Sequence, residues 1–138
     1  RLETALPLRL VGSYDTPGWA SDVLVAGTTA YLADSGGTLI LDVSDPAHPV
    51  KVGAHDGRSS SVLAIMGSHL FVGGMGDLYA LDVSDPAHPL LLGWQEWPGT
   101  VEDVFIPQTA ASGLSADAPP YGYFAGMEKL WVMPPLIE

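Results

Sequence analysis

The chain has 138 residues, a formal net charge of −11 and 47% hydrophobic residues, with 16 glycines and 12 prolines. It is too apolar for a disordered chain and too rich in glycine and proline for a helical one, and its length fits one domain. The five basic residues are scattered, which argues against binding to nucleic acid or to an anionic membrane. No cysteine occurs, which excludes disulfides and cysteine-based metal sites.

An internal repeat organises the predicted elements. The nine residues LDVSDPAHP occur unchanged at Leu41–Pro49 and Leu81–Pro89, so the second copy follows the first by 40 residues. Each repeat unit contains short apolar runs rich in Val, Leu, Ile, Tyr and Phe, and Gly, Pro, Asp or Ser separates these runs. Such runs predict β-strands, and we expect an all-β chain.

The expected strands follow in chain order, beginning with Leu8–Tyr14 ahead of the first unit. The first unit holds Asp22–Ala26, Thr29–Asp34, Thr38–Val43 and Val50–His55. The second holds Ser61–Met66, His69–Gly74, Leu78–Val83 and Leu90–Glu96. The third holds Glu102–Ile106, Tyr121–Ala125 and Lys129–Met133, and it has no fourth strand. We therefore expect one segment with units at about 20–56, 57–97 and 98–138, and residues 7–15 as an additional outer strand.

The strand pattern predicts a β-propeller, because a period near 40 residues with four strands per unit is typical of propeller blades. The segment LILDVSDPAHPVKVG and the following AYLAD-type strands resemble the LVIVD-repeat family, over roughly Pro7 to Met127. Two units match strongly, and the third diverges where Leu130–Pro135 replaces the LDVSDP segment. The resemblance implies propeller blades and an exported or cell-surface location in bacteria or archaea, and it implies no particular chemistry.

Three blades are too few for a ring, since propellers typically have four to eight. A free arc would also leave broad apolar sheet faces in water. We therefore expect another propeller arc as partner, favouring a homodimer in which two copies exchange outer strands to give six blades. A fragment of a longer chain and a subunit of a hetero-complex stay open, because the sequence begins with Arg1 rather than Met. The apolar runs are too short to insert into a membrane.

The repeated turns contain the weak metal candidates His48 and His88. Imidazole is a common metal ligand, but equivalent turns of neighbouring blades lie far apart. Asp45 and Asp85 stand just before proline, where aspartate favours a turn. We expect turn formers and no metal or other cofactor.

Three further groups are candidate binding residues. Asp22 and Asp103 begin innermost strands, where carboxylates can line a channel mouth, and Arg58 lies in a polar connection. Trp19 and Trp97 lie in equivalent links; we expect them to seal blade packing, with stacking on a sugar or anchoring a partner as the alternative. The insertion between Ile106 and Tyr121 offers Leu114 and Tyr121 as contacts. The alternatives are a mobile decoration and a loop that packs across a neighbouring chain.

No catalytic constellation stands out among these residues. We therefore expect a non-catalytic propeller module for scaffolding or for binding a protein or a glycan. The alternative is an enzyme or enzyme subunit with a site at the channel mouth, using Asp22, Asp103 or Arg58. A third possibility is an arc that serves assembly alone.

Overall fold

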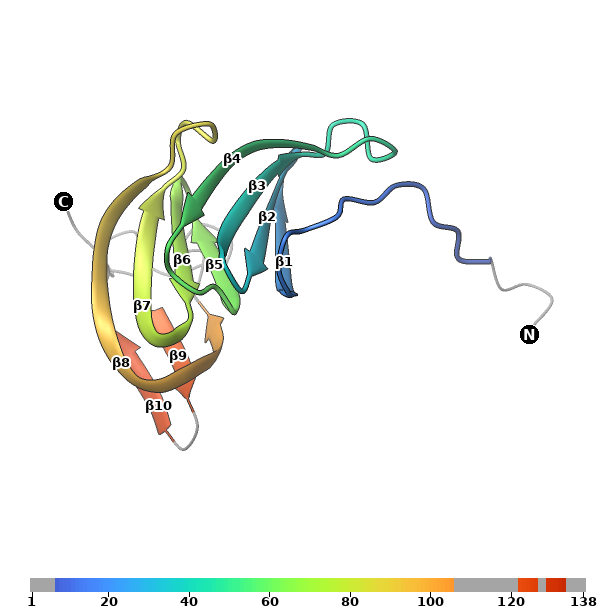
Figure 1. Ribbon diagram of the computed structural model, residues 1–138. Coiled ribbons are helices and arrows are strands. Elements are labelled where there is room, and N and C mark those ends of the chain that lie inside the picture. Colours follow the sequence, from blue (N-terminus) through green and yellow to red (C-terminus); the bar gives the residue numbers. More distant parts are fainter. Residues whose placement is uncertain (1–6, 106–121, 127–128, 134–138) are drawn as a thin grey trace, which may run out of the picture.

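The computed structural model describes residues 7–105, 122–126 and 129–133 (Figure 1). These residues form strands and no helix, which confirms the predicted all-β class. Within the same residues there is accordingly no long apolar helix of the kind that crosses a membrane. The strands are β1 Ala20–Ala26, β2 Thr29–Asp34, β3 Gly37–Asp42, β4 Val50–Asp56, β5 Val62–Met66, β6 His69–Gly73, β7 Met75–Asp82, β8 Leu90–Phe105, β9 Gly122–Gly126 and β10 Lys129–Met133.

The strands form antiparallel blades that follow the sequence repeat. Blade 1 is a four-stranded sheet in the order β1-β2-β3-β4. Blade 2 contains β5, β6, β7 and residues 90–96 of β8, and blade 3 contains residues 101–105 of β8 together with β9 and β10. Figure 1 shows the blades side by side, with the N-terminal segment next to β1 and β10 at the opposite end.

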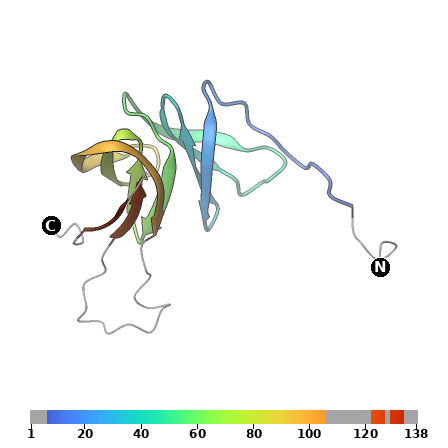
Figure 2. The same cartoon turned by 90° about the horizontal axis from the view of Figure 1, so that it is seen from below.

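The two strands predicted at 90–96 and 102–106 are one continuous strand, β8, so the break expected between them is wrong. Asp77 pairs with Glu96 and Met75 with Thr100, so residues 97–99 oppose only Gly76. The strand bends within this irregular stretch, where Gly99 has φ 111°. A proline at position 98 is tolerated because it lies outside the regular ladder. Blades 2 and 3 therefore share one curved strand, as Figures 1 and 2 show.

The segment at residues 8–14, predicted as an outer strand, has no strand pairing in the single chain. Figures 1 and 2 show it running away from the blades on the side of β1. Its apolar side chains are largely in water: Leu8 is 102% exposed and Leu10 is 84% exposed. An outer strand needs a third strand beside it, and the described residues offer none at this position.

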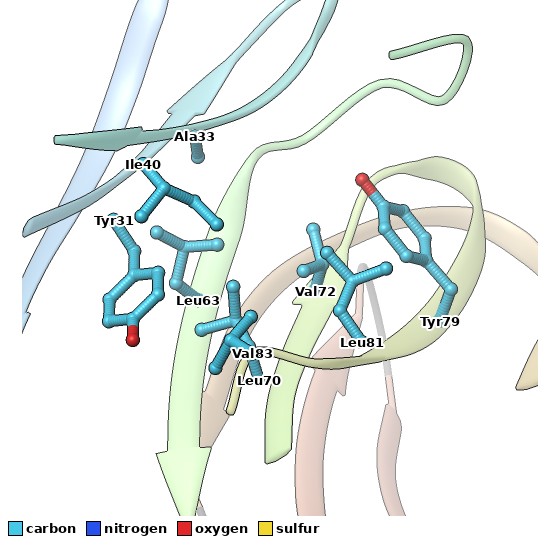
Figure 3. Close-up of a cluster of buried hydrophobic side chains, with 9 residues drawn as sticks. All are labelled: Tyr31, Ala33, Ile40, Leu63, Leu70, Val72, Tyr79, Leu81 and Val83. Carbon is cyan, nitrogen blue, oxygen red and sulfur yellow. The ribbon is translucent and has the colours of Figure 1, made fainter. Parts of the chain in front are cut away.

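The hydrophobic core lies between the blades. Figure 3 shows side chains of blade 1 pointing toward side chains of blade 2, with Ile40 next to Leu63. A second cluster joins blade 2 to blade 3 through Phe71, Val104 and Phe124. Burying such a side chain contributes roughly 1.5–3 kcal/mol, so each blade depends on its neighbours for stability.

Candidate functional site

The outer face of blade 3 exposes apolar side chains at positions that the other blades bury. Tyr123 pairs with Val132 across β9 and β10, and Leu130 lies on the same face. Leu130 is 68% exposed and Val132 is 53% exposed. In blades 1 and 2 the equivalent positions are buried against the next blade. They are Tyr31, Thr38 and Ile40 in blade 1 and Phe71, Leu78 and Ala80 in blade 2. Blade 3 therefore presents a blade-packing face that the described residues leave uncovered.

Blade 1 presents the complementary face at the other end of the arc. Val23 and Val25 of β1 are each 59% exposed. Their equivalents in blade 2, Leu63 and Ile65, contribute to the core between blades 1 and 2. The arc thus ends in two apolar surfaces of the kind that pack together inside it.

The N-terminal segment approaches blade 1 closely at Gly12. A Cβ added to Gly12 would overlap the carbonyl oxygen of Pro46 in the first repeated turn. A Cβ added to Gly53 of β4 would overlap the carbonyl oxygen of Pro86 in the second turn in the same way. Gly12 therefore stands against the turn of blade 1 as Gly53 of the outer strand β4 stands against the turn of blade 2.

Asp22 has a structural role at the junction of blades 1 and 2. One carboxylate oxygen accepts the backbone N–H of Val23 at 2.9 Å, and the other accepts that of Leu63 at 2.9 Å. Asp103 occupies the equivalent place in blade 3 and accepts the N–H of Val104 at 2.9 Å. Both aspartates follow a register shift in their strand. The structure therefore explains the recurrence of aspartate here by hydrogen bonding to the backbone.

Arg58 lies at the outer end of the same junction. Its guanidinium forms an ion pair of 2.7 Å with Asp77 and lies 4.7 Å from the ring centroid of Trp94. The Tyr79 ring lies beside it, and burial raises the pKa of Tyr79 above the usual value. The Nδ1 atom of His55 and one oxygen of Asp77 are buried with no hydrogen-bond partner in the described structure. Among the described residues, no hydrogen bond or ion pair joins Arg58 to Asp22 or Asp103.

The Arg58 cluster was missed by sequence reasoning, apart from Arg58 itself. Asp77 and Trp94 lie on β7 and β8, whereas Arg58 lies in the link between blades. The only available signal was the lone arginine in a short polar link. The contact of Gly12 with Pro46 has a clearer signal in the sequence, since Gly12 and Gly53 stand at the same place in the repeat.

The two repeated turns are built alike, as the sequence predicts. Asp45 accepts the backbone N–H of Ala47 at 3.1 Å, and its other oxygen lies 2.9 Å from His48 Nδ1. Asp85 and His88 repeat this arrangement at 2.9 Å, and the His88 hydrogen bond lowers the pKa of Asp85 below its usual value. Among the residues that the structure describes, no three His, Cys, Asp or Glu side chains gather in a cluster that could hold a metal ion.

Trp19 is exposed on a well-held backbone. Its side chain is 80% exposed in the single chain. Its N–H donates to the Ser35 hydroxyl and its carbonyl accepts the Ser35 N–H, both at 3.1 Å. The adjacent Gly18 N–H donates to the carboxylate of the buried Asp34. The corner therefore presents an aromatic side chain to solvent from a hydrogen-bonded backbone.

The remaining candidate residues are not placed by the structure. Leu114 and Tyr121 lie outside the described residues. Position 97 belongs to β8, but the structure does not place the Trp97 side chain.

Comparison with known proteins gives one family. The model of the LVIVD repeat matches the chain twice, at residues 17–56 and 57–94, which together cover more than half of its length. The first match contains blade 1, and the second contains β5, β6, β7 and the beginning of β8. A search of curated proteins finds no significant match.

Proposed function

Because the chain belongs to the LVIVD repeat family, we propose that it is a non-catalytic β-propeller module that docks onto another propeller arc. In this role it serves as a scaffold or as the binding part of a larger assembly. The blades would act by presenting packing faces, and no bond would be made or broken.

The exposed face of blade 3 is the observation that carries this proposal. Its apolar residues Leu130 and Val132 are more than half exposed, although the equivalent positions in blades 1 and 2 are buried. Repeat units stack because each one covers the hydrophobic face of its neighbour, so an uncovered face favours a further unit. Each Å² of apolar surface removed from water contributes about 25 cal/mol, which drives association.

The engagement of the conspicuous acidic groups also favours a non-catalytic role. Both oxygens of Asp22 already accept backbone hydrogen bonds, and Asp45 and Asp85 are turn formers. A carboxylate held in this way has fewer lone pairs for a substrate.

Solution mass with a matched pair of charge variants tests the proposal. We expect the wild-type chain to sediment at no less than twice its 14.5 kDa mass. Val132→Asp should return it to the mass of one chain, because a buried charge at a packing face is costly. Val50→Asp places the same charge on β4, where Val50 is 56% exposed, and should leave the assembly intact. A wild-type chain that stays monomeric at all concentrations would contradict the proposal.

Trp19 supports a second role, binding of a protein or a glycan at the rim. An exposed aromatic ring on a fixed backbone can stack on a sugar or anchor a partner with little loss of side-chain entropy. We expect Trp19→Ala to remove binding to an immobilised glycan panel while the assembly mass stays unchanged. Glycan binding that survives this substitution, or its absence from the wild-type chain, would argue against a sugar site at Trp19.

A further inference from the structure

We propose that residues 8–14 are an outer strand donated in trans, which completes blade 3 of a second copy by pairing with its β10. This inference rests on the proposed docking of propeller arcs, and it specifies the partner and the strand register. It makes each copy both donor and acceptor of one strand.

The placement of residues 8–14 is the first step of the argument. The close approach of Gly12 to Pro46 repeats the approach of Gly53 to Pro86. Gly53 belongs to β4, the outer strand of the blade that precedes blade 2. Residues 8–14 therefore stand where the outer strand of a blade preceding blade 1 would stand, although that blade has no other strand in the described chain.

The existing outer strands fix the expected register. In blade 1, Gly53 pairs with Ile40, and a register shift follows between Ile40 and Leu41. In blade 2, Gly93 pairs with Ala80, and the shift recurs between Ala80 and Leu81. The equivalent of Ile40 and Ala80 in blade 3 is Val132, by its pairing with Tyr123.

The same rule gives the complete pairing in trans. Gly12 of one copy should oppose Val132 of the other, and Tyr14 should oppose Leu130. The extra residue of the bulge should fall at Val11, as it falls at Val52 and Leu92 in the outer strands of blades 1 and 2. A bulge at the same place in every outer strand preserves the curvature of each blade.

A second copy is the occupant that the two ends of the arc favour. The described chain has one unpaired outer strand, residues 8–14, and one blade that lacks an outer strand, blade 3. Figures 1 and 2 place these two features at opposite ends of the molecule, so they do not meet within one chain. Two copies satisfy both ends at once and give six blades, which is within the usual propeller range.

Strand donation would also bring the free faces together. Val23 and Val25 of one copy would cover the face of Tyr123, Leu130 and Val132 of the other. All five are exposed in the single chain. The junction would then repeat the apolar packing between blades 1 and 2, where Leu63 lies opposite Ile40.

Cross-linking between two different single-cysteine chains tests the register. The chain has no cysteine, so any disulfide comes from the introduced residues. We expect a mixture of Tyr14→Cys and Leu130→Cys chains to form a covalent heterodimer under mild oxidation, because directly opposed residues have the short Cα separation that a disulfide requires. Tyr14→Cys mixed with Val132→Cys, two residues out of register, should form much less.

Gly12→Ala in the Tyr14→Cys chain provides a second readout. Its added methyl group should lift the segment from the Pro46 turn and reduce the yield of heterodimer several-fold. An assembled chain of twice the mass that gives no Tyr14–Leu130 heterodimer would overturn strand donation while leaving the docking function standing. Equal yields from the two mixtures would overturn the register. A chain that is monomeric throughout would overturn the docking function itself.

Discussion

Asp22 of β1 accepts the backbone N–H of Leu63 in β5 at 2.9 Å, and this single side chain joins the innermost strands of blades 1 and 2. The second oxygen of Asp22 accepts the N–H of Val23 within its own strand. A residue that the sequence offers as a channel-mouth acid is thus part of the connection between blades. Asp103 repeats the local half of this arrangement at the end of the arc.

The two aspartates should therefore differ in their effect on stability. Asp22→Ala leaves two backbone N–H groups without their acceptor, and we expect it to lower the free energy of unfolding by about 2–3 kcal/mol. Asp103→Ala removes the bond to Val104 and should cost about 1 kcal/mol. Urea unfolding of both variants measures the difference. Equal losses would show that the bond to Leu63 contributes little.

Gly12 and Gly53, the two glycines that approach the repeated turns, form a second matched pair. Gly53→Ala forces a methyl group against the carbonyl oxygen of Pro86, and we expect a loss of about 1–3 kcal/mol in unfolding free energy. Gly12→Ala meets Pro46 in the same way, but its segment has no strand pairing in the single chain. At a concentration where the chain is monomeric, Gly12→Ala should change stability by less than about 0.5 kcal/mol. Chemical denaturation checks both values, and comparable losses would contradict the weak attachment of residues 8–14.

Arg58 should stabilise the junction through Trp94 as well as through Asp77. The guanidinium lies 4.7 Å from the Trp94 ring centroid, within the range of a cation–π interaction. A double-mutant cycle with Arg58→Ala and Trp94→Ala should give a coupling free energy of about 0.5–1 kcal/mol. Lys51→Ala removes an exposed cation from β4 and serves as the control. Additive effects of the two substitutions would show that the contact between Arg58 and Trp94 does not contribute to stability.

The pH dependence of stability should include the aspartates that end β3 and β7. Backbone N–H donation from Ser44 and Ser84 lowers the pKa of Asp42 and Asp82 below the usual 3.8. A lowered pKa in the folded state stabilises the fold at pH values above 3.8, and this contribution is lost as the pH falls through the folded value. The wild-type urea midpoint should therefore fall on acidification.

An Asp42→Asn, Asp82→Asn variant isolates this contribution. The asparagine oxygen still accepts the serine N–H, but it does not take up a proton in this range. Its urea midpoint should therefore fall less than that of the wild type between pH about 5 and about 2. Parallel pH profiles for the two proteins would exclude these carboxylates as the cause.

The repeat made much of the fold predictable, because identical residues at a fixed spacing imply identical local structure. The turns at Asp45 and Asp85 were predictable for this reason, and both form the expected hydrogen bonds. The continuity of β8 was not, since Pro98 and Gly99 are residues that normally interrupt a strand. The strand persists there because the register shift opposite Gly76 removes the need for regular pairing.

The candidate site was less predictable, since it depends on contacts between blades. The partner of Asp22 is a backbone N–H in the next blade, which no side-chain motif reveals. Trp94 meets Arg58 only because β8 follows β7 along the outer edge of blade 2. The backbone of Trp19 is held in turn by Ser35, a residue with no distinctive signal in the sequence.

The contact between Gly53 and Pro86 has a consequence for how such arrays grow. The glycine and the proline turn both lie within the repeated sequence, and the contact recurs between Gly12 and Pro46. A tandem gene duplication would therefore copy both halves of a junction at once. Lengthening the array would need no newly evolved interface. A substitution of the glycine in one copy would disturb only the junction that this copy forms.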